Sequence, residues 1–140
     1  MSVEIGLNDF FQIEDWDVAA HNTAHRRDVE WLNIAVASLE TERPDSRIAI
    51  LTHWSPSTDS RAQDPKHASS TISSAFATDL SDQACFKSKN VVLWAFGHTH
   101  YNCDFLVTRE GAGALRLYSN QRGYYYAQAE GFNRERTVEV

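Results

Sequence analysis

The sequence has few of the residues that mark disulfide-rich or fibrous proteins. It contains two cysteines, three prolines and six glycines in 140 residues. Cys85 and Cys103 show no C-x-x-C spacing, and no apolar leader follows a basic N-terminus. This pattern predicts free thiols in a reducing compartment, with one disulfide as the alternative. We therefore expect a cytoplasmic protein.

Basic residues are also scarce. Thirteen Lys and Arg face nineteen Asp and Glu, which gives a formal net charge of -6. Binding to nucleic acid or to an anionic membrane surface generally needs a basic face that displaces counterions. The charge therefore argues against nucleic-acid and membrane partners. The composition, with 42% hydrophobic and 23% charged residues, is that of an ordinary globular chain, and its length suits one domain over residues 1–140.

The most apolar run, residues 91–96, is too short to span a membrane and stops at Gly97, His98 and His100. Such a run predicts a buried strand of a parallel sheet. The two histidines would then lie on the turn beyond the carboxyl end of the strand. Ligands bind at this edge in open α/β sheets, because the connecting loops converge there.

A second apolar run, residues 47–52, is read as a second buried strand and ends at His53. Between the two runs, Ser70 and Thr71 can cap a helix over residues 70–82. A strand–helix–strand unit of this kind predicts parallel strands. The two histidine-bearing turns should therefore lie at the same end of one sheet.

Other patterns predict the remaining elements of an α/β fold. Apolar residues at helical spacing predict an amphipathic helix over residues 17–40, with Asp15 as its N-cap and Pro44 in the turn that ends it. The other expected segments are an extended or loop segment over 3–13, a surface loop over 55–70, a hairpin of strands 104–108 and 114–118, an aromatic extended segment from 124, and an edge strand at 137–140. The tyrosines at 124–126 are expected to pack against the fold rather than to form a stacking platform.

Three histidines are the candidate metal ligands. Imidazole nitrogens bind Zn, Mn, Fe and similar ions. His53, His98 and His100 could hold one ion together or serve two ions about 3.5–4 Å apart. The alternative is that they are ordinary turn residues with structural hydrogen bonds. His21 and His25 also have the spacing of a zinc-binding helix, but the glutamate that should follow the first histidine is absent, which favours a structural role.

The two histidine turns carry a family resemblance. Leu51-Thr52-His53, followed by Gly97-His98-Thr99-His100, resembles the last two motifs of the calcineurin-like metallophosphoesterase superfamily, over residues from about 20 to the end. The resemblance implies a β-sandwich flanked by helices. It also implies two divalent ions of the Mn, Fe or Zn class, with His53 and His98 on one ion and His100 on the other. A metal-activated hydroxide would then hydrolyse a phosphate-ester substrate.

The sequence lacks the other motifs of that family. No Asp-x-His, Gly-Asp or Gly-Asn-His occurs in it. Because these motifs lie earlier in the family's domain, the resemblance covers only its C-terminal part. The bridging carboxylate is also missing, and three neutral imidazoles do not offset the charge of two divalent ions. We expect a metal-dependent phosphoesterase of which this chain carries the C-terminal motifs, with the missing motifs encoded upstream of Met1. The alternative is a non-catalytic fragment or remnant with at most a weak metal site.

Overall fold

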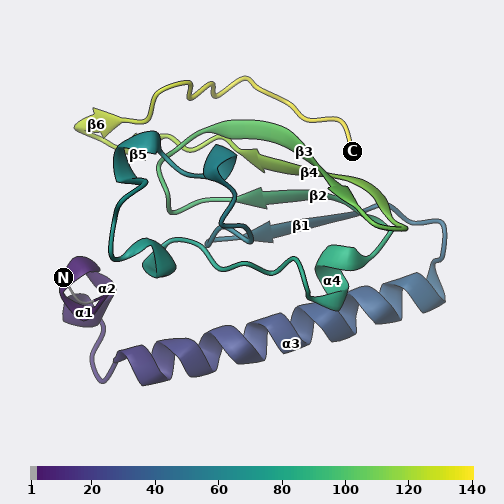
Figure 1. Ribbon diagram of the computed structural model, residues 1–140, viewed down its shortest axis with the longest axis horizontal. Coiled ribbons are helices and arrows are strands. Elements are labelled where there is room, and N and C mark those ends of the chain that lie inside the picture. The colour runs from purple at the N-terminus through teal and green to yellow at the C-terminus, as the bar shows by residue number, and fades with distance from the viewer. Residues whose placement is uncertain (1–2) are drawn as a thin grey trace.

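The protein, described by a computed structural model over residues 3–140, is built on one mixed four-stranded sheet (Figure 1). The strand order is β1-β2-β4-β3. The strands are β1 (Ile48–Thr52), β2 (Val91–Phe96), β3 (Cys103–Arg109) and β4 (Gly113–Ser119). β2 pairs in parallel with both β1 and β4, and β3 runs antiparallel to β4. The α/β class and the parallel pairing of the two apolar strands are confirmed.

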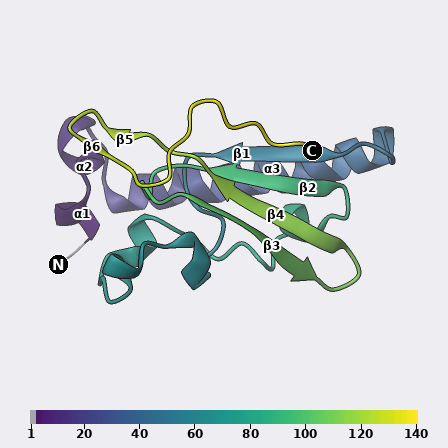
Figure 2. The same ribbon diagram turned by 90° about the horizontal axis from the view of Figure 1, so that it is seen from above.

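A long helix, α3 (Val18–Glu42), lies along one face of the sheet (Figures 1 and 2). It matches the predicted amphipathic helix, but its N-cap is Asp17 rather than Asp15. The Asp17 carboxylate accepts a hydrogen bond from the Ala20 amide at 2.7 Å, whereas Asp15 has a φ of 55°. The helix ends just before Pro44, as predicted, because a proline cannot continue the helical hydrogen bonds.

The N-terminal segment differs from the expectation of an extended or loop structure. It forms two short helices, α1 (Val3–Gly6) and α2 (Asp9–Gln12). Leu7 between them is buried, and the amides of Phe11 and Gln12 both donate to the carbonyl of Asn8. Contact of this segment with the rest of the chain stabilises turns too short to be recognised from periodicity.

The predicted helix over residues 70–82 is wrong. This part of the chain contains one 3₁₀ turn, η3 (Ser73–Ala75), and the short helix α4 (Ala84–Lys87) follows it. The amide of Thr78 and the carbonyl of Phe76 instead bond to the backbone of Ser55. Side-chain hydroxyls in the Ser- and Thr-rich segment also bond to its own backbone, which competes with helix formation. Two further 3₁₀ turns, η1 (Ser60–Ala62) and η2 (Pro65–His67), lie within the predicted surface loop.

The C-terminal third contains the predicted hairpin. β3 and β4 are joined by a turn in which Gly111 and Gly113 have positive φ. A second, small hairpin of β5 (Gly123–Tyr124) and β6 (Ala127–Gln128) follows. The predicted edge strand at 137–140 is wrong, because the segment after β6 has no strand. It runs instead along the face of the sheet away from α3 (Figure 1), where Arg136 donates to the Asp104 carboxylate at 2.9 Å.

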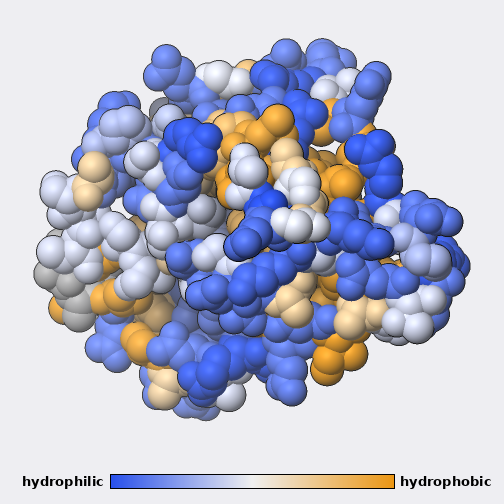
Figure 3. All heavy atoms as spheres, turned by 45° about the vertical axis from the view of Figure 1, so that its right-hand side comes forward, coloured by the Kyte–Doolittle hydropathy of each residue, from blue (hydrophilic) through white to orange (hydrophobic). Residues whose placement is uncertain are grey.

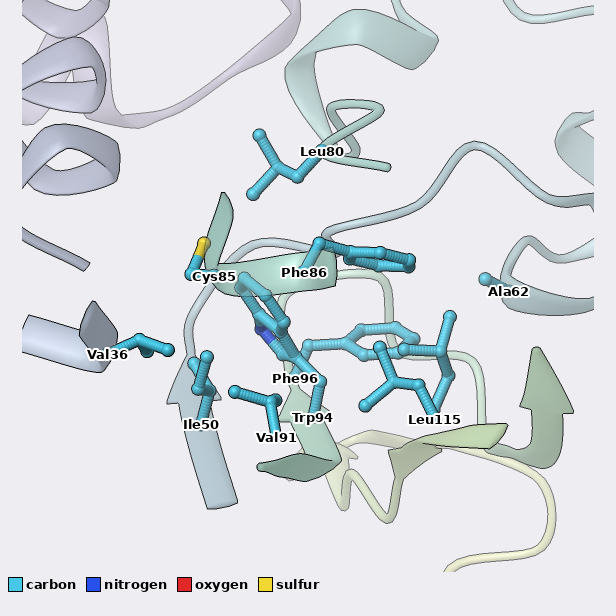
Figure 4. Close-up of a cluster of buried hydrophobic side chains, with 11 residues drawn as sticks. Val36, Ile50, Ala62, Leu80, Cys85, Phe86, Val91, Trp94, Phe96 and Leu115 are labelled. Carbon is cyan, nitrogen blue, oxygen red and sulfur yellow. The ribbon is translucent and has the colours of Figure 1, made fainter. Parts of the chain in front are cut away.

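The core lies between the sheet and the layer that contains α3 and α4 (Figure 4). Trp94 and Val91 of the central strand β2 are fully buried. β1 is an edge strand, so the prediction of a buried strand holds on one face only: Ile50 is buried, but Leu51 is 78% exposed. Both cysteines are free thiols, as predicted. The β-sandwich implied by the resemblance stays a prediction, because one large sheet accounts for the core of residues 3–140.

The surface is mostly hydrophilic, with apolar side chains gathered in separate patches (Figure 3). The exposed large apolar residues include Trp31 and Ile34 on the solvent side of α3. In residues 3–140 no helix is both long and apolar enough to cross a membrane.

The guanidinium of Arg109, at the end of β3, donates hydrogen bonds to two separate segments of the chain. Arg109 is 9% exposed, and its hydrogen bonds all go to backbone carbonyls. The acceptors are Phe86, Ser88, Val91, Ala112 and Gly113, at 2.7–3.2 Å. Arg109 therefore ties the segment from α4 to the start of β2 onto the β3–β4 turn.

We expect Arg109→Lys to lower the free energy of unfolding by about 2–4 kcal/mol, because an ammonium group cannot reproduce the planar set of donors and leaves buried carbonyls unpaired. Urea unfolding followed by circular dichroism would measure the loss. Arg27→Lys, at an exposed position of α3, serves as the matched control. Equal stability of the two variants would contradict this role for Arg109.

Candidate functional site

The histidine-bearing turns lie side by side because β1 and β2 are paired in parallel and in register. Thr52 pairs with Phe96 at the carboxyl ends of the strands. The next residues extend the ladder, since the Gly97 amide donates to the His53 carbonyl at 3.0 Å. Both turns therefore begin at the same position along the strand direction. The predicted placement of the two histidine turns at one end of the sheet is confirmed.

The sequence around the turns permits this close approach. A Cβ atom on Gly97 would lie 3.4 Å from the His53 carbonyl oxygen, so the two turns meet here at van der Waals distance. The Trp94 indole donates to the Thr52 hydroxyl at 2.9 Å, and that hydroxyl donates to the Trp54 carbonyl at 2.7 Å. A buried side chain of β2 thereby fixes the turn after β1.

His53 and His98 are in direct contact. His53 Nε2 lies 3.0 Å from His98 Nδ1. The backbone bends sharply here, with φ of 63° at His98 and 49° at His100. This left-handed conformation costs a non-glycine residue about 1 kcal/mol and persists where the surrounding structure holds it. The turn thus presents two histidine side chains from a strained backbone.

Aromatic rings surround His98. The Trp54 ring lies 3.9 Å and the Phe76 ring 5.0 Å from the His98 ring, centroid to centroid. Burial, and then the neighbouring His53, lower the pKa of His98 to about 4, while the carboxylate of Asp9 acts in the opposite direction. His98 is therefore a neutral imidazole at pH 7, the form that binds metal ions.

His100 points to a different neighbour. The rings of His100 and Tyr124 are nearly perpendicular, with an interplanar angle of 86° and centroids 4.5 Å apart. Its backbone amide donates to Gln121 Oε1 at 2.9 Å, and Gln121 Nε2 donates to the Thr99 hydroxyl at 2.8 Å. Sequence reasoning gave Gln121 no role in the site, although its side chain holds the turn in place.

The two histidines of this turn share a cavity of about 540 Å³. Asp9 of α2 lies on the cavity wall with His98 and His100, and sequence reasoning missed it because residues 3–13 gave no strong pattern. The structure thus brings His53 and His98 into a pair and places His100 on the same cavity. Within the described residues 3–140, no set of three or more His, Cys, Asp or Glu side chains is arranged to hold a metal ion.

The spacing of the histidine pair suits two kinds of chemistry. Two nitrogens that each lie about 2.1 Å from one ion are about 3.0–3.4 Å apart when the angle at the ion is about 90–110°. The observed 3.0 Å lies at the edge of this range. The same distance suits a hydrogen bond in which one neutral imidazole donates to the other. The hydrogen bond requires that at least one of the two rings is neutral, and binding of one ion by both nitrogens requires that both rings are neutral.

The tyrosines at 124–126 do not pack as predicted. Tyr124 is 52% exposed, Tyr125 92% and Tyr126 83%. They lie in the β5–β6 hairpin, whose strands have two residues each and pair only with each other. The small hairpin cannot bury them, so these rings stay exposed, and of the three only Tyr124 lies on the cavity wall.

Comparison with protein-family models, with curated proteins and with solved structures gives no match for this chain. The resemblance to the metallophosphoesterases therefore rests on the motif residues themselves. The structure shows separately that His53 and His98, which are 45 positions apart in the sequence, are in contact.

The lowered pKa of His98 predicts how stability depends on pH. Between about pH 6.5 and pH 4 the unfolded chain binds a proton at this histidine and the folded chain does not, so the metal-free protein should lose stability as the pH falls through this window. His98→Asn, which tolerates the left-handed backbone, should remove this contribution. Urea unfolding of chelator-treated protein at several pH values would measure it.

His67→Asn provides the control for this measurement, since His67 is an exposed histidine of η2. It should keep the pH dependence of the unmodified chain. An unchanged pH dependence in His98→Asn would show that His98 takes up its proton equally in both states.

Proposed function

We propose that this chain carries part of a metal-dependent phosphoesterase centre, in which His53 and His98 bind one divalent ion and His100 serves a second. The observation that supports this most is the 3.0 Å separation of His53 Nε2 and His98 Nδ1 at the carboxyl ends of two parallel strands. Ions of the Mn, Fe or Zn class suit imidazole ligands.

His53 Nε2 and His98 Nδ1 are placed to bind one ion together. The two facing nitrogens have the separation of neighbouring ligands, and burial keeps the His98 ring neutral. The other ring nitrogen, His98 Nε2, is buried and has no hydrogen-bond partner among residues 3–140. When bound, the ions would lower the pKa of a water molecule and polarise the phosphoryl group of a phosphate ester.

Other residues of the chain hold the histidine ligands in place and set the polarity around them. Trp54 and Phe76 shield the His98 ring from solvent and restrict its orientation. Gln121 holds the backbone at His100. Asp9 adds a negative charge on the same cavity, which partly offsets the charge of a cation that the neutral imidazoles leave unbalanced.

A second candidate is a non-catalytic fragment with at most one weak metal site. Two observations favour it: the sequence lacks the carboxylate-bearing motifs of the family, and residues 3–140 contain no arranged group of three ligands. The two candidates share the histidine pair and differ in whether the chain can complete a catalytic centre.

We expect metal-free protein to bind Zn²⁺ in isothermal titration calorimetry, and His53→Ala or His98→Ala to weaken the affinity at least tenfold, because each removes one of two neighbouring ligands. His25→Ala is the matched control, because His25 lies with His21 on α3 at the spacing of a zinc-binding helix. Loss of Zn²⁺ binding in this control alone would assign the ion to α3 and contradict the proposed site.

We expect the isolated chain to hydrolyse 4-nitrophenyl phosphate negligibly with added Mn²⁺. The reason is that no motif carboxylate is present to bridge two ions and hold them together. Release of 4-nitrophenolate, followed by absorbance, would measure the rate. Brisk turnover that is abolished in His98→Ala would contradict this prediction and would show that residues 1–140 complete the centre.

A further inference from the structure

The exposed tyrosines of the β5–β6 hairpin form an ordered aromatic stack beside the cavity. The rings of Tyr124 and Tyr126 are parallel to within 2°, with centroids 5.3 Å apart. Tyr124 also meets the ring of His100 and lies on the wall of the 540 Å³ cavity. Tyr126 therefore stacks on Tyr124, and Tyr124 lines the cavity that His98 and His100 share.

The hairpin is anchored to the turn that carries these histidines. Gly123 has a φ of 76°, and a Cβ atom there would lie 2.7 Å from the Ala129 amide nitrogen, so only glycine fits this close approach. The Asn102 side chain donates to the carbonyls of Gln121 and Glu130, on either side of the hairpin. Tyr124 is thus held in a fixed position relative to His100.

The remainder of the cavity wall has a distinct chemical character. Its apolar part comes from Leu7, Ile72 and Phe76, on segments before β1 and between β1 and β2. Its charged part is acidic, with Asp9 and Asp64, and no lysine or arginine of the described chain lines it. Lys66 Nζ, outside the lining, lies 4.0 Å from an Asp64 carboxylate oxygen, so Asp9 carries the unpaired charge of the wall, and it disfavours any anionic group beyond the phosphate that the metal ions would hold.

We infer that this cavity binds the organic group of the phosphate ester, and that this group is a planar ring without further negative charge. The inference rests on the proposed function for the identity of the substrate as a phosphate ester. A planar ring can stack on Tyr124 and contact Phe76 and Ile72. A volume of about 540 Å³ lies in the usual range for small organic ligands. The ring could belong to a nucleoside or to an aryl alcohol.

The test uses the intact metal-free chain, so that it does not depend on metal binding. Saturation-transfer NMR, at a pH below the pKa of 4-nitrophenol so that this probe is uncharged, would compare adenosine and 4-nitrophenol, as the two kinds of planar probe, with ribose and with adenosine triphosphate. We expect at least one planar probe to bind, ribose not to bind, and the triphosphate to bind at least fivefold more weakly than adenosine. Preference for adenosine or for 4-nitrophenol would distinguish a nucleoside from an aryl ester.

Tyr124→Leu should weaken binding of the planar probe at least fivefold, because it removes the stacking surface. Tyr125→Leu, at the 92% exposed tip of the same hairpin, should leave that affinity unchanged. Binding of neither planar probe, or equal affinity in Tyr124→Leu and the unmodified chain, would overturn the inference. Planar-probe binding with this dependence on Tyr124 in a chain that fails to bind Zn²⁺ would support the cavity assignment while removing the proposed metal function.

Discussion

The parallel pairing of β1 with β2 is the constraint on which the site depends. Because Thr52 and Phe96 are partners and the Gly97 amide continues the ladder to His53, two turns from distant parts of the chain begin at one level. A shift of one residue would turn the side chains of β1 to the opposite face of the sheet. The contact between His53 and His98 is thus a direct consequence of strand register.

The two ends of β2 differ in structure. At the amino end, Arg109 donates hydrogen bonds to the backbone of Val91 and of the preceding segment. At the carboxyl end, the chain leaves the strand through Gly97 into a turn with two left-handed histidines. Rigid support at one end allows strained geometry at the other, which is how functional turns on α/β sheets are commonly built.

Local patterns in the sequence predicted the elements whose residues decide their own structure. The apolar runs gave β1 and β2, the helical spacing gave α3, and the glycines at 111 and 113 gave the hairpin of β3 and β4. The failures lie where distant contacts decide. Residues 70–82 bond to the backbone at Ser55, and Asp9 and Gln121 reach the site from segments in which no metal ligand was predicted. Local patterns in one sequence carry no information about contacts between residues that lie far apart along the chain.

The backbone conformation helps to distinguish the two interpretations of the histidine pair. A structural hydrogen bond between imidazoles places no requirement on His100, and glycine or asparagine would satisfy the left-handed turn at lower cost. Three non-glycine residues of the described chain have positive φ, and two of them are His98 and His100. Strain that is concentrated on the histidines of a single turn, next to a cavity, is typical of a functional site. This concentration favours ligand binding over a purely structural role.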